Sequence, residues 1–467
     1  MQRIGRLGRL LTVWAVRPAV GALLALAVLL TGIFLETSLS VTAQRSLTIF
    51  VFAAVLWVTK PVPLGVSSLL SVVLLPLLGV TDTFDAAATG FASRLVFFLL
   101  LLFLLGEAIT KVGLDEHVAR QLLTASSTPK GSLHRLSGYL LTTALFMPSG
   151  IARTVTFVPI VDRLNDLYEL SERNDFLRSA YLLVGQINPI ASLALMTGGG
   201  MAILSSEIIR IDIRAITWLE WLVYMLPPIV VIYGVSALVL AEVFSVNDTV
   251  TVSHTAASTV DITHDQKVVA VVITATIALW VIGSLTGLST IVPPMLAVVV
   301  LTAPGVRVLT EQDLRTVNWG ILLLFGAILS LIASLKQTGA MAFLIEWLLG
   351  LVPLTTYPVW LAIAIVLFGV VLLRLLFSTA SACLAITLPV IITLAETLSI
   401  EPLFFAFSTV IIVGSTTLLP FHLPTVLIVN EHYSGLHNRD VFFVGLLSLV
   451  VASVVTALSW WLYWPML

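Results

Sequence analysis

The chain has 467 residues, of which 59% are hydrophobic and only 10% are charged. Soluble domains carry about 25% charged residues, so this composition excludes a soluble globular protein. The formal net charge is -2, and no basic run is interleaved with aromatic residues, so nucleic acid is not an expected partner. The single cysteine, Cys383, excludes an internal disulfide and a cysteine-ligated metal cluster.

Apolar runs long enough to cross a hydrocarbon core recur along the chain, and none alternates like the strand of an outer-membrane barrel. We therefore expect an all-α polytopic membrane protein with about 11 membrane-spanning helices. Membrane lipid is then an expected partner. The expected spans are residues 19–35, 47–59, 62–80, 95–109, 180–204, 218–244, 268–285, 291–303, 318–335, 402–430 and 441–464.

The first apolar run follows an N-terminal tail that contains four arginines. The tripeptide Val41-Thr42-Ala43 fits a signal-peptidase site, so the run is either a signal peptide or a retained helix. Because the run is long for the apolar core of a signal peptide, we expect retention, with residues 1–46 forming the tail and the first helix.

Two further apolar stretches, residues 136–160 and 358–398, are each interrupted near the middle by small and polar residues. We expect both to form re-entrant hairpins. If the N-terminus is cytoplasmic, most Lys and Arg residues outside the membrane fall on the inner side, as the positive-inside rule requires. The first hairpin then enters from the inner side and the second from the outer side of what we expect to be a bacterial inner membrane.

The only long polar interruption, residues 245–267, is rich in Ser, Thr, Val and Asp, a composition typical of a linker. It separates residues 47–244 from residues 268–467, and Pro159 and Pro389 close the hairpins of the two parts alike. In the expected topology the two halves have opposite orientations. Inverted repeats with paired broken helices are typical of secondary transporters, whose site lies at the repeat interface near the membrane midplane.

The first hairpin contains the sequence Pro148-Ser149-Gly150-Ile151. Proline, serine and glycine let a helix stop at membrane depth, so the freed amides and the Ser149 hydroxyl can face an anion. The alternative is that these small residues only permit close helix packing. The matching interruption in the other half favours a binding site.

Arg153 follows inside the same apolar helix, where a charge costs at least about 2.5 kcal/mol unless it is paired or hydrated. One interpretation is that its planar fork binds a carboxylate of the substrate. The other is that it pairs with an acid such as Asp162 or Glu107, or faces an aqueous cavity.

The second hairpin offers hydroxyl groups and backbone at Ser378, Thr379, Ala380 and Ser381, without a proline or glycine to enforce its break. Arg374 precedes this break. We expect its side chain to snorkel to the nearby interface rather than to balance the charge of an anion.

An irregular patch follows each hairpin within an apolar span. The first is Gly198 to Gly200, and the second runs from Thr416 through Thr417 and His422 to Thr425. Broken backbone there would supply carbonyls for a cation or close the substrate pocket, and the alternative is a simple kink. His422 is either a titrating group or a hydrogen-bonded structural histidine.

At these residues the chain resembles the divalent anion/sodium symporter family, and within it the citrate/succinate and dicarboxylate exchangers. That family has two Ser-Asn-Thr hairpin motifs, each followed by a proline. Here Ser149-Gly150-Ile151 precedes Pro159, and Thr379-Ala380-Ser381 precedes Pro389. Both asparagines are replaced, by Gly150 and Ala380.

The resemblance implies an elevator-type transporter that forms a homodimer and needs no cofactor except Na⁺ as a coupling ion. Exchange of anions is the alternative form of coupling, because both asparagines of the family's sodium sites are absent. The implied sodium ligands are Ser149, Gly150, Gly198, Gly199, Ser378 and Ala380. The expected substrate-binding residues are Ser149, Gly150, Ile151, Arg153, Thr379, Ala380, Ser381, Thr417 and Thr425.

The predicted function is transport of a small anion, a di- or tricarboxylate first and sulfate or another oxyanion next. A sodium/proton antiporter is an alternative, and it would need a buried carboxylate pair, for which only Glu107 and Glu396 are candidates. We do not expect an enzyme, because the chain lacks a His-Glu-x-x-His motif and a serine/histidine pair at membrane depth.

Overall fold

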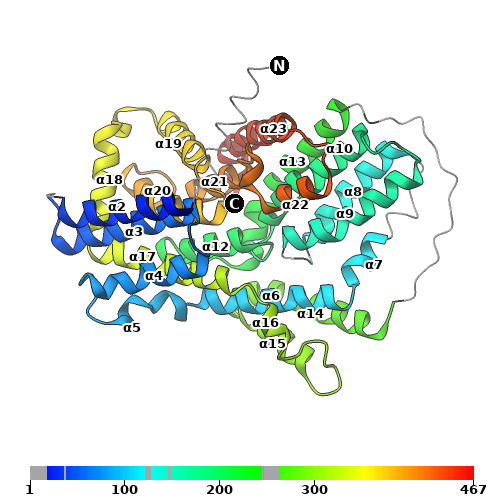
Figure 1. Ribbon diagram of the computed structural model, residues 1–467, viewed down its shortest axis with the longest axis horizontal. Coiled ribbons are helices and arrows are strands. Elements are labelled where there is room, and N and C mark those ends of the chain that lie inside the picture. The colour runs from blue at the N-terminus through cyan, green and yellow to red at the C-terminus, as the bar shows by residue number, and fades with distance from the viewer. Residues whose placement is uncertain are drawn as a thin grey trace. The chain divides into compact units, whose positions relative to one another are not determined.

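The computed structural model describes residues 18–35, 38–120, 128–145, 147, 149–244, 246 and 262–467 (Figure 1). The N-terminal arginines, Pro148 and most of the predicted linker lie outside these residues. All regular structure in the described ranges is helical. The predicted all-α membrane fold is confirmed.

Six helical segments in the described part of the chain are long and apolar enough to cross a membrane. They are α3 (Val41–Thr59), α13 (Trp218–Val243), α14 (His264–Thr286), α17 (Trp319–Gln337), α20 (Ala380–Thr397) and the segment Asn438–Met466, which comprises α23 (Asn438–Leu458), the π-helix η7 (Ser459–Tyr463) and η8 (Trp464–Met466).

Shorter apolar helices complete the set of candidate spans. They are α2 (Pro18–Phe34), α4 (Leu64–Leu77), α15 (Val292–Thr302), α18 (Ala340–Leu351), α19 (Val359–Arg374) and α21 (Pro402–Ser415). The sequence prediction missed α18, whose short apolar run is interrupted by Glu346.

The other elements are shorter or more polar. They are α5 (Phe84–Ala87), η1 (Thr89–Ala92), α6 (Arg94–Lys111), α7 (Leu114–Arg120), α8 (Pro129–Thr143), α9 (Gly150–Leu167), α10 (Asp175–Leu182), η3 (Leu183–Ile187), α11 (Asn188–Ala191), η4 (Ser192–Ala194), α12 (Gly200–Asp212), α16 (Asp313–Thr316), η5 (Leu354–Thr356), η6 (Pro420–His422) and α22 (Pro424–His432).

Local sequence explains where several long helices begin and end. Thr217 starts α13 and Thr263 starts α14, and each forms a reciprocal capping box with the Glu or Gln three residues later. The α14 helix ends at Gly287, whose φ of 77° is the left-handed conformation that glycine adopts without strain. These caps satisfy amides and carbonyls that an apolar surrounding leaves without water.

The chain forms two compact units. The first comprises Met1–Phe97 and Asn318–Ala362, and the second comprises Phe98–Val317 and Ile363–Leu467. Each unit takes segments from both of the halves expected from the sequence. The first hairpin, the second hairpin from Ile363 onward and the irregular patches that follow them belong to the second unit.

In the first unit, α17 packs against α3, α4 and η1 through small and hydroxyl residues. The Ser46 and Ser334 hydroxyls are 2.7 Å apart and hydrogen-bonded, and Gly90 N donates to Ser330 Oγ over 3.1 Å. Small residues let helix backbones approach closely where lipid supplies no hydrophobic driving force.

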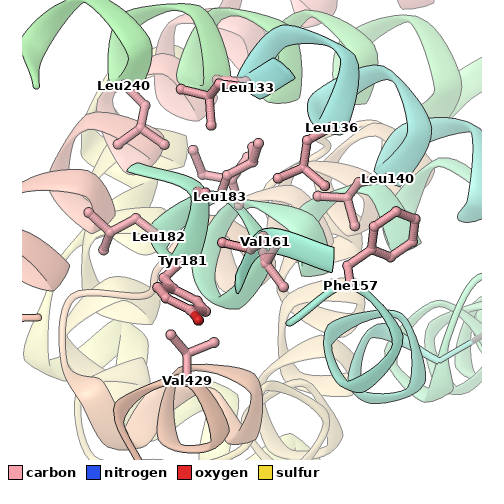
Figure 2. Close-up of a cluster of buried hydrophobic side chains, with 14 of the residues drawn as sticks. Leu133, Leu136, Leu140, Phe157, Val161, Tyr181, Leu182, Leu183, Leu240 and Val429 are labelled. Atoms are coloured by element: carbon pink, nitrogen blue, oxygen red, sulfur yellow. The ribbon is translucent and has the colours of Figure 1, made fainter. Parts of the chain in front are cut away.

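In the second unit, buried hydrophobic side chains join the first hairpin to elements from both halves of the chain. Figure 2 shows Leu136 and Leu140 of α8 and Phe157 of α9 in this cluster, with Leu183 of η3 and Val429 of α22. Phe157, Leu140 and Val429 have no exposed surface. This core fixes the first hairpin on the segments that carry the candidate site.

We predict that Gly90→Ala destabilises the first unit, because the new Cβ would lie 2.1 Å from Gly326 O. Such overpacking costs about 1–3 kcal/mol, which thermal unfolding of the detergent-purified protein measures as a lower melting temperature. Gly350→Ala, in α18 of the same unit, is the control, because nothing lies within 4 Å of its new Cβ. Equal melting temperatures for the two variants would contradict the close approach of η1 and α17.

Candidate functional site

The first hairpin breaks between α8 and α9, and Ser149 starts the second of these helices. Ser149 has an extended backbone (φ -126°, ψ 113°), and its Oγ accepts a hydrogen bond from Ala152 N over 3.2 Å. The hydroxyl therefore serves as a helix cap. Gly150 is half-buried and Ile151 is 44% exposed, so backbone amides of the first turn of α9 are the donors left for a ligand.

Arg153 is fully buried and binds neutral acceptors. Its Nε donates to Asn188 Oδ1 over 2.7 Å, its Nη1 to Met147 O over 2.5 Å and its Nη2 to Ser192 Oγ over 2.6 Å. Pairing with Asp162 or Glu107 is therefore wrong for the described structure. The guanidinium instead ties the hairpin tip to α11 and η4.

The segment that follows the first hairpin is not one continuous helix. It runs through α10, the π-helix η3, α11 and η4, and then an irregular stretch of residues 195–199 precedes α12. Gly198 is buried, and a Cβ at this position would lie 2.1 Å from Ser192 O. Gly199 is extended and precedes the first residue of α12. The glycines thus mark a true break in the helix, which we call the first break, residues 195–199.

The second hairpin breaks between α19 and α20. Thr379 occupies the cap position of α20, but its side chain makes no capping hydrogen bond. Ser378 Oγ is buried and has no hydrogen-bond partner among the described residues. Thr379, Ala380 and Ser381 are half-buried. Unlike Ser149, the hydroxyls of this hairpin are left for a ligand.

Arg374 is fully buried, so the expectation that it snorkels to the interface is wrong. It donates from Nη1 to Phe377 O, at the tip of the second hairpin, and from Nη2 to His422 O over 3.1 Å. Its Nε has no hydrogen-bond partner in the described part of the chain. Arg374 thus ties the second hairpin to η6.

A second break, residues 416–419, separates α21 from η6 and α22. His422 is fully buried, and its Nδ1 accepts a hydrogen bond from Leu419 N over 3.4 Å. Its Nε2 has no hydrogen-bond partner within the described ranges. His422 thus contacts Arg374 through its carbonyl and Leu419 through its ring.

Thr417 and Thr425 are buried and bind the first half of the chain. Gln186 Nε2 donates to Thr417 O over 2.9 Å, and Thr425 Oγ1 donates to Gly185 O over 2.5 Å. Both threonines therefore lie against the π-helix η3. No hydrogen bond between described residues joins the tip residues 149–151 directly to residues 379–381.

The two halves repeat one arrangement. In each, a buried arginine binds a carbonyl at the hairpin tip and an oxygen near the break that follows that hairpin. A charge buried without a counter-ion raises the local electrostatic potential strongly in a medium of low dielectric constant. Two such guanidiniums make the surroundings of both hairpin tips attractive to anions.

The described residues do not supply the buried carboxylate pair that a sodium/proton antiporter would need. Glu396 is exposed, and Glu107 is only half-buried. No group of three or more His, Cys, Asp or Glu residues in the described ranges could hold a metal ion. Any cation at the hairpin tips would have to be bound by hydroxyl and carbonyl oxygens.

Sequence reasoning missed Gln186, Asn188 and Ser192, although they hold the candidate site together. The Asn188-Pro189 pair reads as a kink, and Ser192 as one of many small residues. The available signal was the presence of two amide side chains within an apolar run, since a buried amide needs partners.

A family model described as the sodium:sulfate symporter transmembrane region matches residues 18–467. A membrane protein of Cupriavidus necator is 25% identical over 411 residues, which cover 82% of this chain and 79% of that protein. An uncharacterized transporter of Haemophilus influenzae is 24% identical and covers 90% of this chain and 92% of its own length. The sodium-dependent dicarboxylate transporter SdcS of Staphylococcus aureus is 23% identical and covers 88% and 84%.

Among solved structures, the Alcanivorax borkumensis YdaH transporter matches with a TM-score of 0.56 and 16% sequence identity. The match covers 81% of this chain and 87% of that one. It supports the all-helical fold described above.

We predict that Arg153→Lys weakens the link between the first hairpin and the segment α11–η4. Lysine keeps the charge but lacks the planar fork, so some of the three acceptors lose their donors. We expect the free energy of unfolding to fall by roughly 1–3 kcal/mol, measured by thermal unfolding in detergent.

The matched control is Arg135→Lys, in α8 of the same hairpin, because Arg135 is exposed. That change should stay within about 0.5 kcal/mol of the parent protein. If the two lysine variants unfold alike, Arg153 does not hold the hairpin tip.

Proposed function

The chain belongs to the sodium:sulfate symporter family, and from this premise we propose that it is a secondary active transporter of small di- and tricarboxylate anions. Members of this family are transporters and not enzymes. The single observation that carries the proposal is the pair of buried guanidiniums, Arg153 and Arg374, bound to neutral acceptors at the two hairpin tips.

Two positive charges in two hairpins suit a substrate with two separated negative groups. Each carboxylate would meet backbone amides of a helix start, at Gly150 and Ile151 in one hairpin and at Ala380 and Ser381 in the other. Thr379 would add its uncapped hydroxyl. Arg153 acts through its field, because most of its donors are used within the protein. Arg374 is fully buried and donates to Phe377 O and His422 O, so we propose that it also acts through its field.

The substrate class rests on a relative as well as on the site. The Staphylococcus aureus relative is named a sodium-dependent dicarboxylate transporter, and we extend dicarboxylate transport to this chain. Sulfate is the second candidate, because the matching family model is described by that anion. A compact sulfate would occupy one hairpin tip, whereas a dicarboxylate would bridge both.

For the mechanism, we propose elevator-type alternating access between inverted repeats in a homodimer with a cytoplasmic N-terminus, in a bacterial inner membrane. Both hairpin tips and both breaks lie in one compact unit, and α3, α4, α17 and α18 lie in the other. A unit that carries the whole site can move as a body against a fixed partner unit.

For the coupling, we propose two modes that one experiment separates. Sodium coupling follows the name of the Staphylococcus aureus relative, and Ser378 Oγ is a buried oxygen without a partner in the described structure. Exchange against an internal anion is favoured by the first hairpin. There Met147 O accepts from Arg153 and Ser149 Oγ accepts from Ala152 N, so both oxygens are already used and are not left for a sodium ion.

Uptake by proteoliposomes tests this function. We expect labelled succinate to accumulate when the vesicles experience an inward sodium gradient or contain unlabelled dicarboxylate. Citrate and sulfate should be assayed in parallel, and protein-free vesicles are the control. Failure of all three anions to be carried or to compete, under both driving forces, would contradict the proposal, and sulfate uptake alone would replace the dicarboxylate.

We further predict that Thr379→Val raises the KM for succinate about ten- to a hundredfold, because a hydrogen-bond donor to a charged group is lost. The stability of the Thr379→Val variant should change little, since the hydroxyl does not cap α20.

Ser149→Ala should lower the free energy of unfolding by about 1 kcal/mol, because it removes the side-chain cap of α9.

Thr379→Ser keeps the hydroxyl and is the matched control, with a KM close to that of the parent protein. An unchanged KM in Thr379→Val would remove this side chain from the site.

A further inference from the structure

The π-helix η3 is followed by a proline that removes one backbone donor. Pro189 has no N–H, so it leaves Gly185 O without a donor in an α-helix, or Val184 O without one in a π-helix. Both carbonyls are bound by threonine hydroxyls. Thr425 Oγ1 donates to Gly185 O over 2.5 Å, and Thr154 Oγ1 donates to Val184 O over 3.0 Å.

The two threonines come from different halves of the chain. Thr154 lies in α9 of the first hairpin, and Thr425 lies in the first turn of α22, after the second break. The carbonyls of Val184 and Gly185 therefore join the first hairpin to the second half. All these residues belong to the same compact unit.

Gln186, in the same π-helix, makes the third link. It is fully buried, and its Nε2 donates to Thr417 O over 2.9 Å, to Thr417 Oγ1 over 3.2 Å and to Val441 O over 2.7 Å. One amide thus holds the peptide of the second break against α23.

The fit around this link is close. A Cβ at Gly445 of α23 would lie 2.5 Å from Thr417 O and 3.0 Å from Gln186 Nε2. The Thr417 carbonyl is therefore packed against Gly445 and is bound by Gln186.

We propose that Gln186 and Thr425 are positioning residues, which orient the second break from the π-helix of the first half and so fix the two parts of the anion site relative to each other. Neither residue needs to touch the substrate. The inference rests on the proposed function for its transport readout only, because the positioning itself is a property of the fold.

The main variant is Gln186→Leu, which keeps the size of the side chain but removes its donors. Leaving a buried carbonyl without its donor corresponds to a factor of about ten, so we expect the KM for succinate to rise about tenfold. The maximal rate should stay within about twofold of the parent value. Hydrogen exchange, followed by mass spectrometry, should accelerate in peptides covering residues 416–423.

The matched control is Gln44→Leu in the first unit. Gln44 Nε2 also donates to two backbone carbonyls, Gly32 O over 2.8 Å and Leu35 O over 2.6 Å. A similar loss of melting temperature with an unchanged KM and unchanged exchange at 416–423 would show that the effect of Gln186 is positional and not a general loss of stability.

A second pair of variants removes a single hydroxyl, in case Gln186→Leu does not fold. Thr425→Val should raise the KM and the exchange rate, and Thr425→Ser, which retains the donor to Gly185 O, should restore both. Parent values of KM and exchange in both Gln186→Leu and Thr425→Val would overturn the proposal. If the parent protein carries no anion, the proposed function fails, and the exchange measurements alone decide the positioning.

Discussion

A guanidinium buried without a carboxylate is the constraint on which both parts of the candidate site depend. Removing a charge from water is costly unless polar atoms surround it. Arg153 meets this need with Met147 O, Asn188 Oδ1 and Ser192 Oγ, and Arg374 uses Phe377 O and His422 O. Because those acceptors lie on a hairpin tip and on the broken segment after it, each arginine holds the two together and keeps its positive charge where an anion would bind.

The same rule of satisfied polar groups explains why the breaks are stable. An apolar surrounding offers no water to a freed amide or carbonyl, so each one must find a partner inside the protein. Ser149 caps α9, and Thr154 and Thr425 bind the carbonyls of Val184 and Gly185, one of which Pro189 leaves without a donor. Irregular backbone is tolerated here because its partners come from neighbouring elements, and these partners also fix its geometry.

Much of the fold could be predicted from the sequence, because prolines and clusters of small residues mark hairpins and breaks locally. The burial of Arg374 could not, since its acceptor His422 O lies 48 residues further along and a charge near the end of an apolar run looks interfacial. The neutral partners of Arg153 were equally hidden, at distances of 35 and 39 residues. The π-helix was missed because one extra residue in a turn leaves no mark on an almost uniformly apolar pattern.

The contacts of the π-helix also bear on the order in which the protein can mature. The hydrogen-bonded partners are far apart in sequence. Gly185 and Thr425 are separated by 240 residues, Gln186 and Thr417 by 231, and Gln186 and Val441 by 255. During synthesis the first hairpin and η3 enter the bilayer long before these partners are made. Until then the Gly185 carbonyl and the Gln186 side-chain amide are either hydrated or without a hydrogen-bond partner. The candidate site is therefore assembled only after the last helices are inserted, and a truncated chain would expose polar backbone within the membrane.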